Sequence, residues 1–193
     1  MPTWLLTLAA AALLFALPAT AAIGAEPKVE VSVANKGGAL IVDALVDVPV
    51  DPRTAWEVMT DFEHMTSIVD NLKSSQVLSR SGNTWIVRQD GVAKYGLLSF
   101  PFASERELRL EPMTRILSRQ LSGTAKSMES EAKVAPVADG VRINYHAETV
   151  VESTLGRFFG ASFVRHEVEE QFLAMGREML RRHAVADSQG GAK

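Results

Sequence analysis

A predicted strand ends and a helix begins within residues 48–63, whose sequence is VPVDPRTAWEVMTDFE. Asp51 is a favourable helix N-cap, and Pro52 suits the first helical position, where its missing N–H costs nothing. Apolar residues then recur at helical spacing, so one face of this helix is expected to be buried. The residues of that face are Ala55, Trp56, Met59 and Phe62. A second short helix or turn is expected over residues 61–70.

The residues before this helix predict a β-hairpin. Valines alternate with other residues over residues 29–33, and apolar residues alternate with aspartates over residues 40–48. The segment Asn35-Lys36-Gly37-Gly38 lies between the two runs and is typical of a turn. Because each run is apolar on one side only, the hairpin is expected to bury one face.

The residues after the helix predict a sheet and a final helix. Residues 72–152 alternate between apolar and polar positions in one strand after another, which is typical of an antiparallel sheet with one face in water. An amphipathic helix is expected over residues 162–182. Packing these elements together predicts an α+β fold with a curved antiparallel β-sheet wrapped around a long C-terminal α-helix.

Small residues on the inner face of this sheet predict an apolar cavity beside the helix. They are Gly91, Ala93, Ser130, Ala132 and Ala147. Small side chains leave space between a sheet and a helix that larger ones would fill. A tightly filled core is the alternative.

The first 25 residues contain no charged side chain, whereas all 20 basic and 23 acidic residues of the chain lie from Glu26 onward. An apolar run over residues 4–17 is followed by Pro18 and then by Ala19-Thr20-Ala21, which is the order of a secretory signal peptide. We therefore expect a cleaved signal and a periplasmic or secreted protein. An uncleaved membrane anchor is the alternative.

The rest of the chain is expected to form one domain. Residues 26–184 have the length of a single globular domain, and residues 185–193 predict a disordered polar tail. The formal net charge of −3 argues against non-specific nucleic-acid binding. The absence of cysteine excludes disulfides, thiol chemistry and a lipidated N-terminal cysteine. The four histidines lack metal-ligand spacing, so no metal is predicted. The chain also has no P-loop or G-x-G-x-x-G motif, and no cofactor is predicted.

Residues 48–63, the order of the elements and the final amphipathic helix resemble the START-like (SRPBCC) superfamily. Within it, the closest branch is that of the polyketide cyclase/dehydrase and coenzyme Q-binding proteins. The resemblance extends over about residues 29–182. It implies a helix-grip fold with an elongated apolar cavity for a lipid, quinone, sterol or polycyclic ligand. The superfamily holds carriers and enzymes, so the fold alone leaves the activity open.

Four polar residues fall on the inner face of the predicted sheet, where a ligand would lie. They are Gln89, Tyr95, Arg106 and Tyr145. Arg106 lies on the same side of its strand as Leu108 and Leu110, so it is expected to point inward. A buried arginine must be paired, and a ligand carbonyl or carboxylate would serve as its partner. Solvent at the start of the strand, or an internal partner, is the alternative.

Apolar residues of the inner face and of two aromatic clusters are expected to line the cavity or to close it. They are Trp85, Phe100, Phe102, Phe158, Phe159, Phe163, Phe172 and Met175. Residues 156–162 combine glycines with bulky aromatic residues. We hypothesise that they form a gate over the cavity mouth that touches lipid when it opens. A hydrophobic plug is the alternative.

The sequence thus predicts a periplasmic binding or carrier protein for a lipid or an isoprenoid quinone-like molecule. The inner face offers no evident acid–base pair, so no catalytic residue is assigned and binding is favoured over catalysis. A polyketide cyclase/dehydratase-like enzyme on the same fold is one alternative. A partner-binding module with a filled core is the other.

Overall fold

The structure is a computed structural model that describes residues 26–95, 98–151 and 160–190. The strands are β1 (Lys28–Lys36), β2 (Ala39–Val48), β3 (Leu72–Ser81), β4 (Thr84–Tyr95), β5 (Leu98–Glu111), β6 (Arg115–Gly123), β7 (Ser127–Val137) and β8 (Gly140–Val150). The helices are α1 (Pro52–Met59), the 3-10 helix η1 (Phe62–Ser67) and α3 (Ala161–Gly190).

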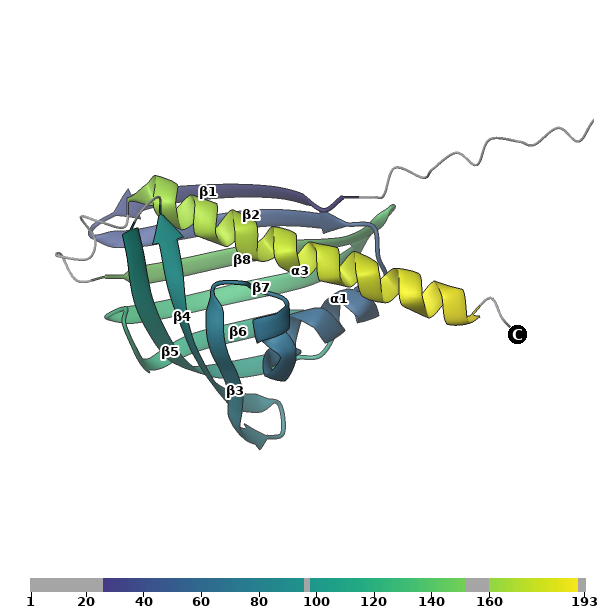
Figure 1. Ribbon diagram of the computed structural model, residues 1–193, viewed down its shortest axis with the longest axis horizontal. Helices are drawn as coiled ribbons and strands as arrows, with labels where there is room; N and C mark the ends of the chain where they lie inside the picture. Colours follow the sequence, from purple (N-terminus) through teal and green to yellow (C-terminus); the bar gives the residue numbers. More distant parts are fainter. Residues whose placement is uncertain (1–25, 96–97, 152–159, 191–193) are drawn as a thin grey trace, which may run out of the picture.

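The strands form an eight-stranded sheet in the order β1-β2-β8-β7-β6-β5-β4-β3, and neighbouring strands are antiparallel. The helices α1 and η1 carry the chain from β2 to the far edge of the sheet at β3. Figure 1 shows the sheet curving around α3, which runs along its inner face. The predicted helix-grip fold is therefore confirmed.

The hairpin and the helix start that were predicted from residues 29–63 are both present. Gly37 and Gly38 adopt φ angles of 61° and 87°, which glycine tolerates best and which a tight β1–β2 turn requires. At the helix start, Asp51 Oδ1 accepts a hydrogen bond from the backbone N–H of Thr54 at 3.0 Å, and Asp51 Oδ2 accepts one from the Thr54 hydroxyl at 2.6 Å. Asp51 is the N-cap of α1, with Pro52 at the first helical position.

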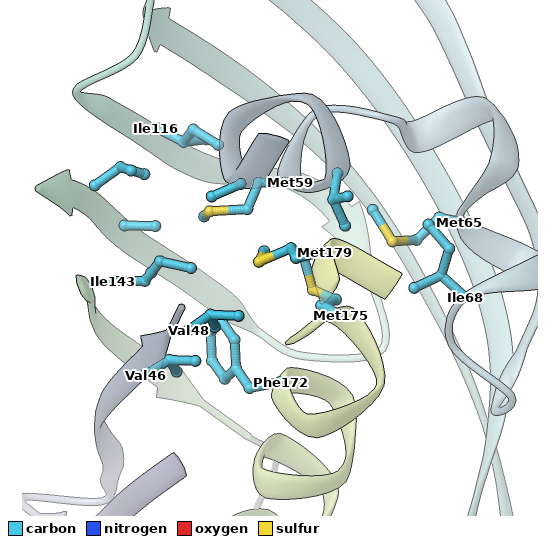
Figure 2. Packing of buried hydrophobic residues seen from close by; sticks show 14 of the residues in the cluster. Val46, Val48, Met59, Met65, Ile68, Ile116, Ile143, Phe172, Met175 and Met179 are labelled. Atoms are coloured by element: carbon cyan, nitrogen blue, oxygen red, sulfur yellow. The ribbon is translucent and has the colours of Figure 1, made fainter. Parts of the chain in front are cut away.

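The hydrophobic core fills the space beneath the middle of α3. Phe172, Met175 and Met179 of this helix are 6%, 5% and 1% exposed and belong to one cluster with residues of α1 and the sheet. Figure 2 shows these side chains gathered with Val48 and other core residues. The alternative of a filled core thus holds for one half of the molecule.

The helix α3 continues to Gly190, past the predicted end at Arg182 and through residues 185–190, which were expected to be a tail. Ala184 and Ala186 are strong helix formers. His183 Nε2 also lies 3.5 Å from Asp187 Oδ2, one helical turn further on. Local helix propensity and this pair extend the helix beyond its buried stripe.

An ion-pair cluster ties α3 to η1. Arg182 contacts both Glu178 Oε1 at 2.6 Å and Asp61 Oδ2 at 2.7 Å, and Arg181 contacts Glu178 Oε2 at 2.7 Å. Hydrogen bonds from Arg181 and Arg182 lower the pKa of Glu178 from 4.5 to about 2, against an opposing effect of burial. Burial alone would raise the pKa of Asp61, but hydrogen bonds from His64 and Arg182 outweigh it and lower that pKa.

Acidification is expected to destabilise the fold through this cluster. A carboxylate with a lowered folded-state pKa stabilises the fold above its unfolded pKa, and that stability is lost as the pH falls through the folded value. For Glu178 this window runs from about pH 4.5 down to about pH 2. Glu178→Gln is expected to lower the free energy of unfolding at pH 7 by about 1–2 kcal/mol and to flatten its decline below pH 4.5. Urea unfolding from pH 7 to pH 2 measures both effects, and an unchanged pH profile would contradict the assignment.

None of the helices within the described ranges is both long and apolar enough to cross a membrane. Residues 1–25, which carry the predicted signal, lie outside those ranges.

Candidate ligand-binding cavity

A cavity lies beneath the N-terminal half of α3, beside the packed core. It consists of an outer chamber of about 290 Å³ and an inner chamber of about 190 Å³. The residues that line both chambers are Asn71, Phe102, Ser104, Met128 and Gln171. Together the two chambers reach the size range of about 300–1,000 Å³ that is typical of small-molecule sites. The predicted cavity is therefore present. Of the five small inner-face residues that suggested it, Ala93 lines it, whereas Ala132 belongs to the packed core.

The outer chamber has a largely apolar lining. Phe100 from β5 and Phe163 from α3 meet edge to face with their ring centroids 6.1 Å apart, and both line this chamber with Phe102. The small residue Ala93 also lines this chamber. A Cβ atom at Gly91 would overlap the Phe102 ring and the Asn71 carbonyl oxygen. Glycine at this position thus lets Phe102 lie against β4.

The inner chamber is more polar than the outer one, and side chains from β4, β5 and β8 contribute its polar groups. Gln89 from β4, Arg106 from β5 and Tyr145 from β8 all line it. Arg106 Nη2 donates a hydrogen bond to Gln89 Oε1, and Gln89 Nε2 donates to the Ser75 hydroxyl on β3 at 3.0 Å. The structure thus brings three of the four predicted polar residues together at one place.

Arg106 carries a charge that no carboxylate of the described residues neutralises. Its Nε is buried without a hydrogen-bond partner in that part of the chain. The side chain as a whole is half-buried and borders the inner chamber. Burial lowers the pKa of Arg106, and the nearby Tyr145 opposes this shift. A guanidinium keeps its charge in proteins, so the inner chamber contains a fixed positive charge.

Tyr145 supplies a second polar group to the inner chamber. Burial raises the pKa of Tyr145, while a hydrogen bond with Ser130 and the charge of Arg106 oppose the rise. The phenol therefore stays protonated at neutral pH and can donate a hydrogen bond. Its ring meets Phe172 edge to face at 5.2 Å, so the core fixes one side of the chamber.

Buried side-chain atoms without a hydrogen-bond partner concentrate in this region. Among the described residues they are Ser104 Oγ, Arg106 Nε and Ser118 Oγ, all from β5 and β6. Ser104 and Arg106 line the inner chamber. Because buried polar atoms in native proteins nearly always have partners, this concentration indicates a place for a polar group of a ligand or for ordered water.

Several predicted site residues do not line the cavity. Trp85 lies at the opposite end of β4, where its ring packs against Phe62 at 6.2 Å and beneath the Arg80 guanidinium at 4.6 Å. Phe172 and Met175 belong to the packed core. The prediction placed these residues on the correct face of their strand or helix. The side-chain pattern does not show where along that strand or helix a residue lies. The Tyr95 side chain, Phe158 and Phe159 lie outside the described part of the structure, as does most of the hypothesised gate.

Other lining residues were not predicted. Ser104 shares its parity with Arg106, and Gln171 continues the helical spacing of Val164 and Val168, so both were detectable. Asn71 gives no periodic signal because it lies in the segment between η1 and β3. Its Nδ2 donates to Glu167 Oε2 at 2.8 Å, which ties that segment to α3 across the outer chamber.

The outer face of the sheet has larger depressions, of about 480 and 470 Å³. Charged side chains line much of both, including Asp43, Lys133 and Glu107. A small apolar ligand needs a mainly apolar lining, which the outer chamber of the inner cavity provides. The inner cavity is therefore the candidate site despite its smaller volume. The described residues contain no group of three or more histidine or acidic side chains arranged for a metal ion.

Comparisons with known proteins agree with this fold. A family model described as "Polyketide cyclase / dehydrase and lipid transport" matches residues 39–184. A search of curated proteins gives no match.

Solved structures show the same fold at low sequence identity. TTHA0849 from Thermus thermophilus has a TM-score of 0.63 at 15% identity, over 75% of this chain and 98% of that one. The Zhui aromatase/cyclase from Streptomyces sp. R1128 has a TM-score of 0.56 at 17% identity, over 76% and 94%. The human StarD13 lipid transfer and protein localization domain has a TM-score of 0.59 at 13% identity, over 78% and 84%.

Proposed function

Because the chain belongs to the polyketide cyclase/dehydrase and lipid transport family, we propose that it binds and carries a hydrophobic small molecule in its internal cavity. The observation that carries this proposal is the division of the cavity into an apolar outer chamber and a polar inner one. Burial of apolar ligand surface stabilises such a complex by about 25 cal/mol per Å², and a few polar groups fix the orientation. A lipid or an isoprenoid quinone-like molecule fits this description.

We further propose that the protein works in the periplasm or is secreted. This part rests on residues 1–25, with their apolar run, their proline and their small residues before the first charge. A carrier outside the cytoplasm must exchange its ligand with a membrane or a partner, so transient membrane contact is part of the proposal. N-terminal sequencing of the exported protein tests it, and a retained Met1 would contradict cleavage.

A cyclase or dehydratase is the second candidate. Tyr145 and Arg106 both border the inner chamber, where a protonated phenol and a guanidinium would polarise a ligand carbonyl. Among the described residues, no carboxylate or imidazole lines that chamber to act as a general base. Turnover of a polycyclic polyketide substrate that is lost in Tyr145→Phe would favour this second function.

Filling the outer chamber is expected to abolish binding. Ala93 is 8% exposed and lines this chamber, so Ala93→Phe would occupy the space of the ligand. Organic extraction of the purified protein and mass spectrometry should detect a bound lipid in the wild type and at least about 10-fold less in Ala93→Phe.

The matched control is Ala135→Phe, which adds the same ring on the outer side of β7. Ala132 and Val134 point into the core from the other side of this strand. It is expected to retain the lipid. No extractable lipid in the wild type, together with no thermal shift by a panel of lipids and quinones, would contradict the carrier function.

A further inference from the structure

The cavity contains a positive charge, that of Arg106, which no carboxylate of the described residues balances. Arg106 borders the inner chamber, and among the described residues its polar partner is the neutral Gln89. Among the described residues, Glu167 is the acidic residue that lines the outer chamber, and it already accepts a hydrogen bond from Asn71. Burying a cation without a counter-ion is costly, and a ligand of opposite charge would offset this cost.

The polar groups of the inner chamber match a planar anion. Arg106 Nε and Ser104 Oγ are buried without a hydrogen-bond partner in the described part of the chain. The Tyr145 phenol, which has a hydrogen bond with Ser130, stays protonated near Arg106. A carboxylate has two oxygens that accept several hydrogen bonds, and a guanidinium edge binds them in a bidentate manner. A quinone or alcohol would satisfy some of these donors but would leave the charge of Arg106 without a counter-ion.

We propose that the ligand is a hydrophobic monocarboxylic acid whose carboxylate binds Arg106 in the inner chamber while its apolar tail occupies the outer chamber. This inference rests on the proposed function and narrows its ligand class from lipids and quinones to acids. The orientation follows from the two linings. Phe100, Phe102 and Phe163 surround the tail, and Glu167 keeps the anionic head out of the outer chamber.

Dodecanoic acid and 1-dodecanol are suitable probes because they share a tail and differ in charge at pH 7.5. Isothermal titration calorimetry of the delipidated mature protein is expected to give at least about 10-fold tighter binding of dodecanoate. Arg106→Gln is expected to weaken dodecanoate binding by about 10–100-fold and to change dodecanol binding by less than about 3-fold. Arg106→Lys, which keeps the charge, is expected to restore part of the preference for the acid.

The matched control is Arg109→Gln, which removes the same charge from the exposed side of the same strand and should leave both affinities unchanged. Binding of dodecanol to Arg106→Gln also shows that this variant is folded. Equal affinity of the wild type for the two probes, or an unchanged preference in Arg106→Gln, would overturn the inference and leave the carrier function standing. Failure of every lipid and quinone to bind would overturn both.

Discussion

Replacing Met179 with alanine is expected to lower the free energy of unfolding by about 2–5 kcal/mol. Met179 is 1% exposed and belongs to the core cluster between α3, α1 and the sheet. Figure 2 shows it among Met59, Met175 and Ile143. Its removal leaves a void that surrounding residues from three elements cannot close without moving. The variant therefore loses the transfer free energy of the removed atoms and also bears the cost of the cavity. Urea unfolding at pH 7 measures the effect.

The matched control is Met128→Ala, because Met128 borders both chambers of the cavity and is not among the buried core residues. Shortening a side chain that already faces a void removes few contacts, so the expected loss is below about 1 kcal/mol. Similar losses in the two variants would contradict the division of the molecule into a packed half and a hollow half.

The parts of the fold that could be predicted are those with local sequence signals. Alternation along residues 29–48 and the Asp51-Pro52 helix start are local signals, and each predicted its element correctly. The end of α3 was misplaced by eight residues because the prediction followed the buried stripe to Arg182. Residues 183–190 remain helical without adding to the buried stripe, through local propensity and the contact of His183 with Asp187.

The sequence predicted which residues of the candidate site lie on the inner face of the sheet, but not where along the strands they meet. Gln89, Arg106 and Tyr145 were placed on the inner face by alternation, and the structure brings them together in one chamber. The same rule assigned Trp85 to the cavity, whereas the structure places it under η1 beside Phe62. Which inner-face residues meet depends on the register of β3, β4 and β5, and a single strand carries no information about that register.

The unpaired donors of the inner chamber imply a cost to the empty protein. Natural proteins commonly give up stability at binding sites, where polar groups stay poised for a ligand and not for one another. Arg106 is such a group, since burial of its guanidinium is compensated by one hydrogen bond to Gln89 and by no carboxylate of the described residues. The residue that binds the ligand is then also one that weakens the fold.

Replacing Arg106 with methionine is therefore expected to raise the free energy of unfolding of the ligand-free protein by about 1–4 kcal/mol. Methionine fills much of the same volume with an unbranched apolar chain that adapts to irregular gaps. It removes the cost of burying the charge, and we expect this gain to outweigh the loss of the donor to Gln89 Oε1. Gln89 Nε2 keeps its hydrogen bond to the Ser75 hydroxyl at 3.0 Å. In a chain of this size the melting temperature should rise by about 2–4 °C for each kcal/mol.

Calorimetry on delipidated wild type and variant measures this difference, because bound ligand would stabilise the wild type alone and hide it. Arg109→Met is the matched control, and at an exposed position of the same strand it should change the stability by less than about 0.5 kcal/mol. Adding dodecanoate should then raise the melting temperature of the wild type and leave that of Arg106→Met nearly unchanged. A strong loss of stability in Arg106→Met would instead make Arg106 a structural residue, with its charge balanced within the protein and no role left for an anionic ligand.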